Sequence, residues 1–389
     1  MWIKRNKSQS LFAVLCLCLG LMTSYNSAAS NPAPDEIIRL GQALFFDTNL
    51  SVNRSQACAT CHDPERAFSD GRENGVSGAV SLGDDGFSLG DRNTPSATYA
   101  SLIPDFHKSE EGEFVGGFFL DGRAETMVKQ AGLPFINPIE MGMPDAAAVV
   151  NRVSENPYYV SALKKHFGEA ILTDPEQAFL AITQSIVAFE RTDLFAPFDS
   201  KYDRFLRGEY QMTDEENLGR ILFFSDQVNC SSCHLLDTLS TSRKETFTNY
   251  QYHNIGLPTN TRVRLANGVD MSHRDLGLLE NPAVNDPAQA GKFRVPSLRN
   301  VAVTGPYMHN GIFQKLSTAI LFYGKFTLGD RQSQTNPETG ELWGEAEVAE
   351  TVNLELLREG QPINADRAKS LAAFLTTLTD QRYEPLLVN

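Results

Sequence analysis

The sequence predicts a mainly α-helical protein of two domains joined by long connections. Its 389 residues exceed one ordinary hydrophobic core and suit two domains of fewer than about 200 residues each. One segment with helical apolar spacing occurs twice, once in each half. Runs that alternate like a β-strand are few and short. These three observations favour a helical fold in which a module is repeated.

The repeated segment precedes a cysteine pair each time. Residues 40–47 read LGQALFFD, and residues 218–225 read LGRILFFS. Apolar residues recur at three- and four-residue spacing in both, which predicts a helix. Each predicted helix leads through a short polar loop to Cys-x-x-Cys-His. We therefore expect two related modules, each a helix packed on whatever its cysteines hold.

Three further helices and two long loops are expected between and after these modules. Helical patterns cover residues 145–153, 174–191 and 364–378. Polar stretches rich in loop-forming residues cover 69–92 and 325–350. Pro197 lies in a candidate hinge, so the predicted domains are 30–195 and 196–389.

Charge excludes two classes of partner. The formal net charge is −14, which disfavours binding to nucleic acid or to an anionic membrane surface. A charged protein partner is expected to present a basic patch.

The first 29 residues resemble a secretory signal peptide. Lys4, Arg5 and Lys7 form a basic start, and residues 11–22 form an apolar run too short to span a bilayer. Small residues follow at 27–29. We expect cleavage there and a periplasmic protein without a membrane span; an uncleaved anchor is the alternative.

The cysteines outside this leader form two haem attachment motifs. In the c-type motif, two thiols three positions apart bind the two vinyl groups of one haem, and the next residue, a histidine, ligates its iron. Zinc or two disulfides are the alternatives, but paired zinc motifs usually lie closer together in sequence. The predicted covalent and iron-binding residues are Cys58, Cys61 and His62 in the first motif, and Cys230, Cys233 and His234 in the second.

The loop after the first motif suggests an open coordination position. Residues 63–91 contain no histidine and no methionine, whereas a haem that only carries electrons usually has a second protein ligand. A ligand from elsewhere is the alternative, and the candidates are His107, His166, His253, His273 and His309. Glu140, flanked by apolar residues, is a candidate for proton transfer or simply a surface helix residue.

Taken together, these motifs identify a family resemblance over nearly all of the chain beyond the leader. The sequence resembles the bacterial di-haem cytochrome c peroxidase and MauG family, and is closer to the MauG-like branch, in which tyrosine ligates the second haem. The matching segments besides the two haem motifs are residues 92–95, 119–124, 137–141, 295–300 and 304–311.

The resemblance implies two cytochrome-c-like domains, each with one c-type haem. The first haem would be peroxidatic and the second would transfer electrons. Glu140 would be the acid–base catalyst, with Gln130 and Pro134 beside it. A calcium ion would lie between the domains, bound by Asn93, Thr304 and Pro306; oxygen ligands of this kind suit calcium.

Three positions place the chain within the family. The displaceable histidine of peroxidases that need reductive activation is missing. Tyr323 matches the second haem's distal ligand, and the alternatives are Met308 and Met271. A phenolate stabilises ferric and higher oxidation states better than a thioether does. Leu120 stands where the family normally has a tryptophan between the haems, so charge sharing through an indole is not available.

The resemblance predicts a periplasmic enzyme that uses hydrogen peroxide to form a high-valent haem species and to oxidise a partner protein. The first alternative is peroxide detoxification with electrons from a small cytochrome or cupredoxin. The second is a non-catalytic di-haem electron carrier. Monomer and homodimer both remain open.

Overall fold

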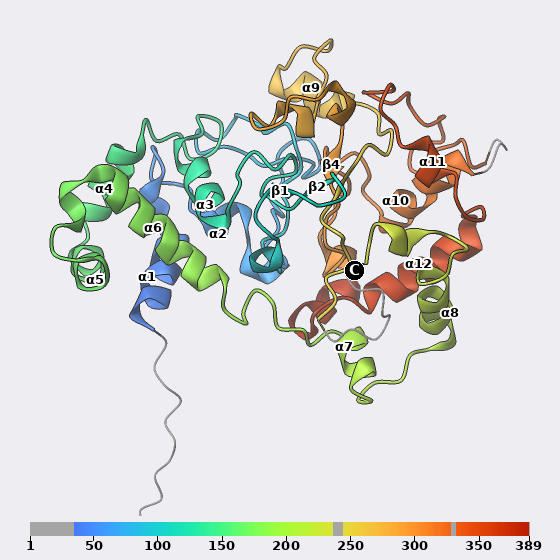
Figure 1. Cartoon of the computed structure of the whole chain (residues 1–389), viewed down its shortest axis with the longest axis horizontal. Helices are drawn as coiled ribbons and strands as arrows, with labels where there is room; N and C mark the ends of the chain where they lie inside the picture. The colour runs from blue at the N-terminus through green and yellow to red at the C-terminus, as the bar shows by residue number, and fades with distance from the viewer. Residues whose placement is uncertain (1–34, 236–243, 328–331, 389) are drawn as a thin grey trace, which may run out of the picture. The chain divides into compact units, whose positions relative to one another are not determined.

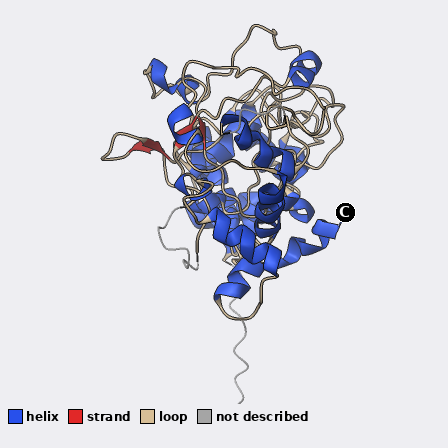
Figure 2. Cartoon of the chain, turned by 90° about the vertical axis from the view of Figure 1, so that its right-hand side faces the viewer, coloured by secondary structure: helices blue, strands red, loops and turns tan. Residues whose placement is uncertain are grey.

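The computed structural model describes residues 35–235, 244–327 and 332–388. Helices and loops make up nearly all of this part of the chain (Figure 1, Figure 2). The predicted mainly α class is therefore confirmed. The predicted signal peptide lies outside the described residues.

Twelve α-helices are present in the described part of the chain. Their bounds are α1 Glu36–Phe45, α2 Cys58–Cys61, α3 Met127–Ile136, α4 Ala146–Ser154, α5 Pro157–Phe167, α6 Pro175–Glu190, α7 Lys201–Leu206, α8 Asp214–Phe223, α9 Thr261–Asn267, α10 Leu316–Phe322, α11 Leu354–Leu357 and α12 Ala365–Thr376.

The strands of the described residues are two residues long and form two antiparallel pairs. β1 (His107–Lys108) pairs with β2 (Phe114–Val115), and β3 (Tyr252–His253) pairs with β4 (Phe293–Arg294). In the second pair Tyr252 lies opposite Arg294. This pair joins segments that are about forty positions apart in the chain.

The two repeated helices, α1 and α8, pack in the same way. Gly41 of α1 lies against the backbone carbonyl of Ser185 in α6, and Gly219 of α8 lies against that of Ser370 in α12. A Cβ atom at either glycine would overlap the carbonyl oxygen. Close approach of two helix backbones requires a residue without a side chain at such a point. The internal repeat therefore extends to helix packing.

Each repeated helix contributes to a separate hydrophobic core. The larger core is built from buried residues between Leu40 and Phe195. A second core is built from buried residues between Tyr202 and Leu378. From residue 35 on, the chain nevertheless forms one compact unit. The division into domains at residues 195 and 196 stays a prediction.

The other predicted helices are also present, as α4, α6 and α12. Asp145 and Asp174 accept hydrogen bonds from backbone N–H groups in the first turns of α4 and α6, as N-cap residues do. α3 was not predicted, and its sequence explains why: Gly132 and Pro134 both lie inside it, and both disfavour a helix interior.

The glycine-rich stretch 69–92 is a loop, as expected, and packing holds it in place. Val76, Ala79 and Val80 form a small buried cluster with Val263 from the second half of the chain. Side chains of Ser51 and Ser55 donate to the carboxylate of Asp84, each at 2.6 Å. The middle of the loop is thus anchored to both halves of the chain.

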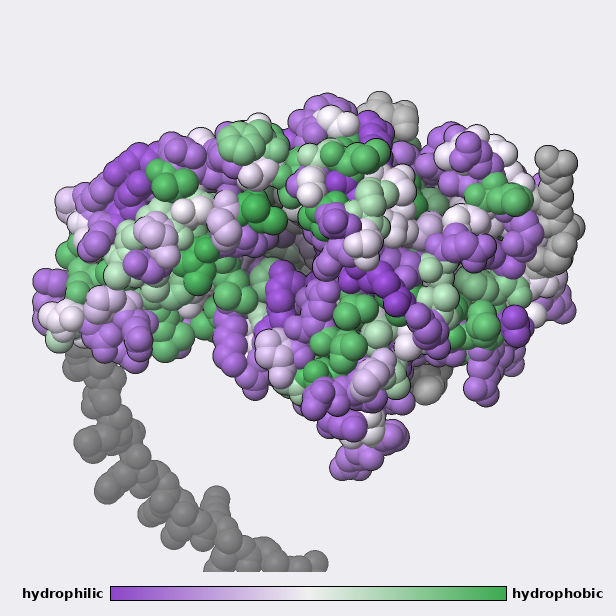
Figure 3. All heavy atoms as spheres, turned by 90° about the horizontal axis from the view of Figure 1, so that it is seen from above, coloured by the Kyte–Doolittle hydropathy of each residue, from purple (hydrophilic) through white to green (hydrophobic). Residues whose placement is uncertain are grey.

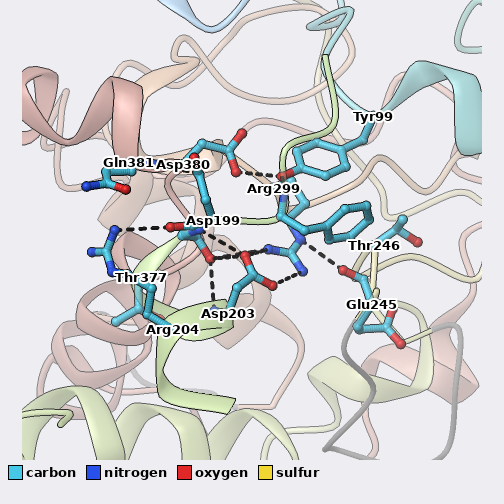
Figure 4. Close-up of polar contacts among 12 residues, drawn as sticks. Tyr99, Asp199, Asp203, Arg204, Glu245, Thr246, Arg299, Thr377, Asp380 and Gln381 are labelled. Atoms are coloured by element: carbon cyan, nitrogen blue, oxygen red, sulfur yellow. Dashed lines mark hydrogen bonds and ion pairs between the residues drawn. The ribbon is translucent and has the colours of Figure 1, made fainter. Parts of the chain in front are cut away.

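A buried polar cluster connects the two halves (Figure 4). The guanidinium of Arg299 donates to both carboxylate oxygens of Asp203, at 2.6 and 3.0 Å. The hydroxyl of Tyr99 donates to Asp380 at 2.5 Å, and the Asn300 amide donates to the same carboxylate at 2.7 Å. Tyr99 belongs to the first half and the other residues to the second.

On the surface drawn in Figure 3, hydrophobic residues occur in small groups among hydrophilic ones. Within the described ranges, every helix is too short or too polar to cross a bilayer.

Candidate haem sites

The first cysteine pair lies on one short helix whose end positions a histidine. Cys58 and Cys61 begin and end α2, and His62 follows as its C-cap. The His62 Nδ1 atom lies 3.1 Å from the carbonyl oxygen of Phe68. Burial lowers the pKa of His62, so its ring is neutral.

The second pair repeats this arrangement. Cys230 opens a 3₁₀ turn, and Cys233 ends it. The His234 Nδ1 atom lies 3.1 Å from the carbonyl oxygen of Phe247. Burial lowers the pKa of His234 to about 4.

Both histidines are thus prepared to bind a metal. A backbone carbonyl accepts only, so Nδ1 carries the proton in each ring. Nε2 then keeps a lone pair, and a hydrogen bond at the other nitrogen fixes the ring as in metal-binding histidines. The four cysteines are unpaired, and their thiols are next to these rings in sequence. These features fit two c-type haems.

Zinc and disulfides fit less well. The four cysteines form no disulfide bond. Among the described residues no three His, Cys, Asp or Glu side chains are grouped as a metal site.

The loop that carries the Phe247 carbonyl is held by neighbouring side chains. Arg299 Nε donates to the Glu245 carbonyl at 2.9 Å, and the Ser297 hydroxyl donates to the Thr246 carbonyl at 2.7 Å. The Arg299 guanidinium also lies 5.3 Å from the centre of the Phe247 ring. Figure 4 shows Arg299 between Asp203 and the Glu245 segment. The acceptor for His234 therefore has a fixed position.

Glu140 lies near the first cysteine pair, largely buried. One carboxylate oxygen, Oε2, is buried without a hydrogen-bond partner in the structure. Burial raises the pKa of Glu140, whereas the nearby cation Arg123 opposes this effect. The charge of Glu140 in turn raises the pKa of Cys61, so the two side chains are neighbours. A carboxyl with an unused oxygen here could exchange a proton with a small ligand.

Gln130 and Pro134 lie one helical turn apart on α3 and therefore share a face. Both are partly exposed, whereas Ala131, Gly132 and Phe135 are buried. The Pro134 carbonyl accepts from the Met141 N–H at 3.2 Å, which ties α3 to the residue after Glu140. The predicted trio Glu140, Gln130 and Pro134 thus belongs to one local structure.

Tyr323 lies at the end of α10, near the second cysteine pair. Burial raises the pKa of its phenol, and the charges of Cys233 and Cys230 raise it further. Within the described residues, this hydroxyl makes no hydrogen bond. The alternative ligand Met271 is 51% exposed, and Met308 packs against a different buried cluster, around Phe313 and Trp343.

The candidate calcium residues come from two segments that meet. The Asn93 N–H donates to the His309 carbonyl at 2.7 Å, and its side-chain amide donates to the Ala79 carbonyl at 3.0 Å. Thr304 and Pro306 precede His309 by a few positions. Among the described residues, the Asn93 amide oxygen accepts no hydrogen bond, and neither do the carbonyls of Thr304 and Pro306. These oxygens suit a hard cation such as calcium.

The remaining histidines have other surroundings. His107 is exposed, and His166 lies 3.6 Å from Glu36. His309 stacks on Phe293 with ring centres 3.7 Å apart. His253 is partly buried on β3, and His273 is exposed.

Leu120 is 9% exposed, and its carbonyl accepts from the Arg294 N–H at 2.9 Å. Position 120 therefore lies directly beside β4, in the second half of the chain.

Sequence reasoning missed two ionisable side chains near the first site. Arg123 lies 3.9 Å from the centre of the Phe119 ring and 2.7 Å from Asp121, and its charge reaches Glu140. Glu190, in α6, is buried near Cys58 with one oxygen unpartnered. Arg123 lies within the segment 119–124 that carried the resemblance; no pattern marked Glu190, because it occupies an ordinary position of an amphipathic helix.

Residues 35–211 match the family described as di-haem cytochrome c peroxidase. The chain is 52% identical to the methylamine utilization protein MauG of Paracoccus denitrificans, over 92% of each chain. It is 28% identical to the cytochrome c551 peroxidase of Pseudomonas aeruginosa, over 79% of this chain and 77% of that one. The crystal structure of the diheme peroxidase BthA from Burkholderia thailandensis is similar, with a TM-score of 0.78 and 31% identity over 91% of this chain and 88% of that one.

Proposed function

The chain belongs to the di-haem cytochrome c peroxidase family, and from that membership we propose that it uses hydrogen peroxide to oxidise a partner protein, as a MauG-like enzyme. It is a hydrogen-peroxide-dependent oxidoreductase with two c-type haems. Family membership thus favours an enzyme over a non-catalytic electron carrier.

Each residue has a proposed role. Cys58 and Cys61 would bind the first haem, with His62 as the iron ligand. The second would be bound by Cys230 and Cys233, with His234 and Tyr323 as its iron ligands. When bound, haem supplies an iron centre that exchanges electrons with peroxide and with the partner.

The chain's own contribution to peroxide cleavage is proton transfer. Glu140 would take a proton from one oxygen of the peroxide and give it to the other, which leaves as water, while the haem, when bound, would supply the electrons. Its unpartnered Oε2 is available for this exchange. Gln130 would orient the peroxide by a hydrogen bond, and Pro134 would limit access of water.

The observation that carries the MauG-like assignment is the position of Tyr323. Its side chain is partly buried beside Cys230 and Cys233, and burial raises the pKa of its phenol. A phenol in such surroundings ionises only when a cation meets its oxygen. A ferric haem iron would be that cation, and a phenolate ligand would favour storage of oxidising equivalents.

We also propose a calcium ion at Asn93, Thr304 and Pro306, and export to the periplasm. The calcium proposal rests on free oxygen atoms in two neighbouring segments. The proposal of export rests on the pattern of the first 29 residues and on c-type haem attachment, which takes place outside the cytoplasm. The partner would be a redox protein or a protein substrate with a basic surface, since the chain carries a net charge of −14.

Peroxide detoxification with a small electron donor is the second candidate, and Leu120 is the observation that favours it. An aliphatic residue at this position cannot relay an electron as an indole can. Fast turnover with reduced cytochrome c would favour this candidate, whereas slow turnover together with oxidation of a partner protein would favour the first.

Rapid mixing of the di-ferric protein with peroxide tests the proposal. We expect the Soret band to change without prior reduction. Glu140→Gln should slow this change by about 100-fold or more, because proton transfer by a positioned group contributes at least that factor. The exposed Glu125→Gln serves as the control. A wild-type protein that requires reduction first, or an unchanged rate in Glu140→Gln, would contradict the scheme.

A further inference from the structure

A buried arginine on β4 has no counterion among the described residues. Arg294 is 6% exposed, and its Nε–H has no hydrogen-bond partner. No ion pair within the described ranges includes it. Other buried arginines, by contrast, are paired: Arg299 with Asp203, and Arg264 with Glu347.

The groups around Arg294 do not replace a counterion. Tyr250 and Tyr252 are its electrostatic neighbours, but both hydroxyls donate elsewhere, to Thr246 and to the Gly116 carbonyl. Burial raises the pKa of both phenols, so they are neutral. An isolated buried cation is strongly unfavourable unless an anion meets it. These surroundings therefore favour an anionic ligand at this point.

A second buried donor lies on the neighbouring strand. The Asn353 side-chain amide lies 3.4 Å from His253 Nδ1, and its oxygen accepts from the Leu356 N–H. Nδ1 of His253 is therefore the acceptor, and Nε2 carries the proton. That Nε2 is buried and has no partner. The pair β3 and β4 thus offers two unpartnered donors.

The position of this strand pair identifies the anion. Next to Arg294, the Val295 carbonyl accepts from the Thr248 hydroxyl at 2.7 Å, and the residue before Thr248, Phe247, orients the His234 ring through its carbonyl. Four residues before His253, the Asn249 N–H donates to the Cys233 carbonyl at 2.8 Å. β3 and β4 therefore border the second haem site. A haem carries two carboxylates, its propionates, and bound haem would place them among such neighbours.

We propose that Arg294 binds a propionate of the second haem. A guanidinium and a carboxylate form strong charge-assisted hydrogen bonds, often through two N–H groups. The backbone of Arg294 is itself fixed by its bond to the Leu120 carbonyl. This inference rests on the proposed attachment of the second haem at Cys230, Cys233 and His234.

Two spectroscopic measurements on the haem-loaded protein test the proposal. Resonance Raman spectroscopy detects the propionate bending mode, and spectroelectrochemistry gives the reduction potential of each haem. In Arg294→Gln the bending band should shift, and the potential of the second haem should fall because a nearby cation favours the reduced iron. The potential of the first haem should stay unchanged. Arg358→Gln, which removes an exposed arginine of the same half, should change neither quantity.

Arg294→Lys covers the case in which the glutamine variant does not fold. This variant should shift the bending band, because a lysine has no planar pair of donors. Its second-haem reduction potential should stay close to that of the wild type, because the positive charge is kept. Unchanged Raman bands and potentials in a folded variant with two haems would overturn the proposal, as would a change confined to the first haem. A protein without a second attached haem would instead refute the haem assignment. Neither the Raman band nor the reduction potential depends on activity with peroxide.

Discussion

Glu140 and Glu190 are both buried carboxyls near the first cysteine pair, but their surroundings differ. Glu140 has Arg123 as a nearby cation and Asn137 as a hydrogen-bond partner, and both oppose the effect of burial on its pKa. For Glu190, burial alone raises the pKa, to about 8. At the scale of single residues, the neighbours of Glu140 favour its charged form, whereas burial alone acts on Glu190 and favours its neutral form.

Glu190 should make stability depend on pH. Its ordinary pKa of 4.5 is raised to about 8 in the folded protein, so the folded state binds the proton more tightly. Its favourable contribution is complete below pH 4.5 and is lost as the pH rises to about 8. In Glu190→Gln the free energy of unfolding should lose this dependence, which is about 1.4 kcal/mol per pH unit at most.

Urea denaturation of the haem-loaded protein at pH 5 and pH 8 measures this effect. The exposed Glu110→Gln should keep the wild-type dependence. An equal fall in stability for wild type and Glu190→Gln between these two pH values would show that Glu190 does not titrate as expected.

Tyr323 makes a second prediction at the residue scale. Tyr323→Met should raise the reduction potential of the second haem, because a thioether stabilises ferric iron less than a phenolate does. Redox titration followed by visible absorption measures the change. The partly buried aromatic Tyr307, outside the proposed iron ligands, provides the control as Tyr307→Phe. A second-haem potential that does not respond to Tyr323→Met would remove Tyr323 from the coordination sphere.

At the scale of elements, the repeated helices depend on backbone contact. α1 meets α6 at Gly41, and α8 meets α12 at Gly219. Each contact leaves no room for a methyl group. The short helix or turn that carries each cysteine pair then follows in the chain, so the contact also positions the haem motif.

Gly219→Ala and Gly41→Ala should each destabilise the protein by about 1–3 kcal/mol or more, because the added Cβ would force two helix backbones apart. Gly208→Ala has open space around the added atom, although its φ of 77° adds strain of its own. Thermal unfolding followed by circular dichroism measures the differences. A melting temperature in Gly219→Ala at or above that of Gly208→Ala would contradict the close approach.

At the scale of the whole molecule, buried charges connect the two halves. Arg92 pairs with Asp121 at 2.5 Å in its own half, and with Asp275 at 2.6 Å and Glu280 at 2.8 Å in the other. The cluster around Arg299 and Asp203 reaches Tyr99 in the same way (Figure 4). These contacts explain why two hydrophobic cores form one compact unit.

Arg299→Met should cost about 3–5 kcal/mol of unfolding free energy, because it leaves the Asp203 carboxylate buried without its partner. Arg382→Met, which breaks the exposed pair with Glu65, should cost less than about 1 kcal/mol. Urea denaturation of both variants makes the comparison. Similar losses in the two variants would contradict a stabilising role for the buried pair.

Local sequence patterns determined the helical class, the repeat and the two haem motifs. Attachment of a haem needs two thiols and a histidine at fixed spacing, and a helix needs a fixed apolar period, so both are visible in a few consecutive residues. The same holds for α4, α6 and α12, which begin at recognisable caps. α3 escaped detection because its glycine and proline contradict its local propensity, and packing on α6 overrides that.

Only the tertiary structure decided which distant groups meet. Contacts between separate segments bring the Phe68 and Phe247 carbonyls to the rings of His62 and His234. Such contacts also bury Glu190 without a charged partner, and they bury Arg294 without a counterion among the described residues. Burial and charge pairing are properties of such contacts, and no short pattern encodes them. The sequence alone therefore determined where haem would attach, whereas the fold decided which side chains could act on it.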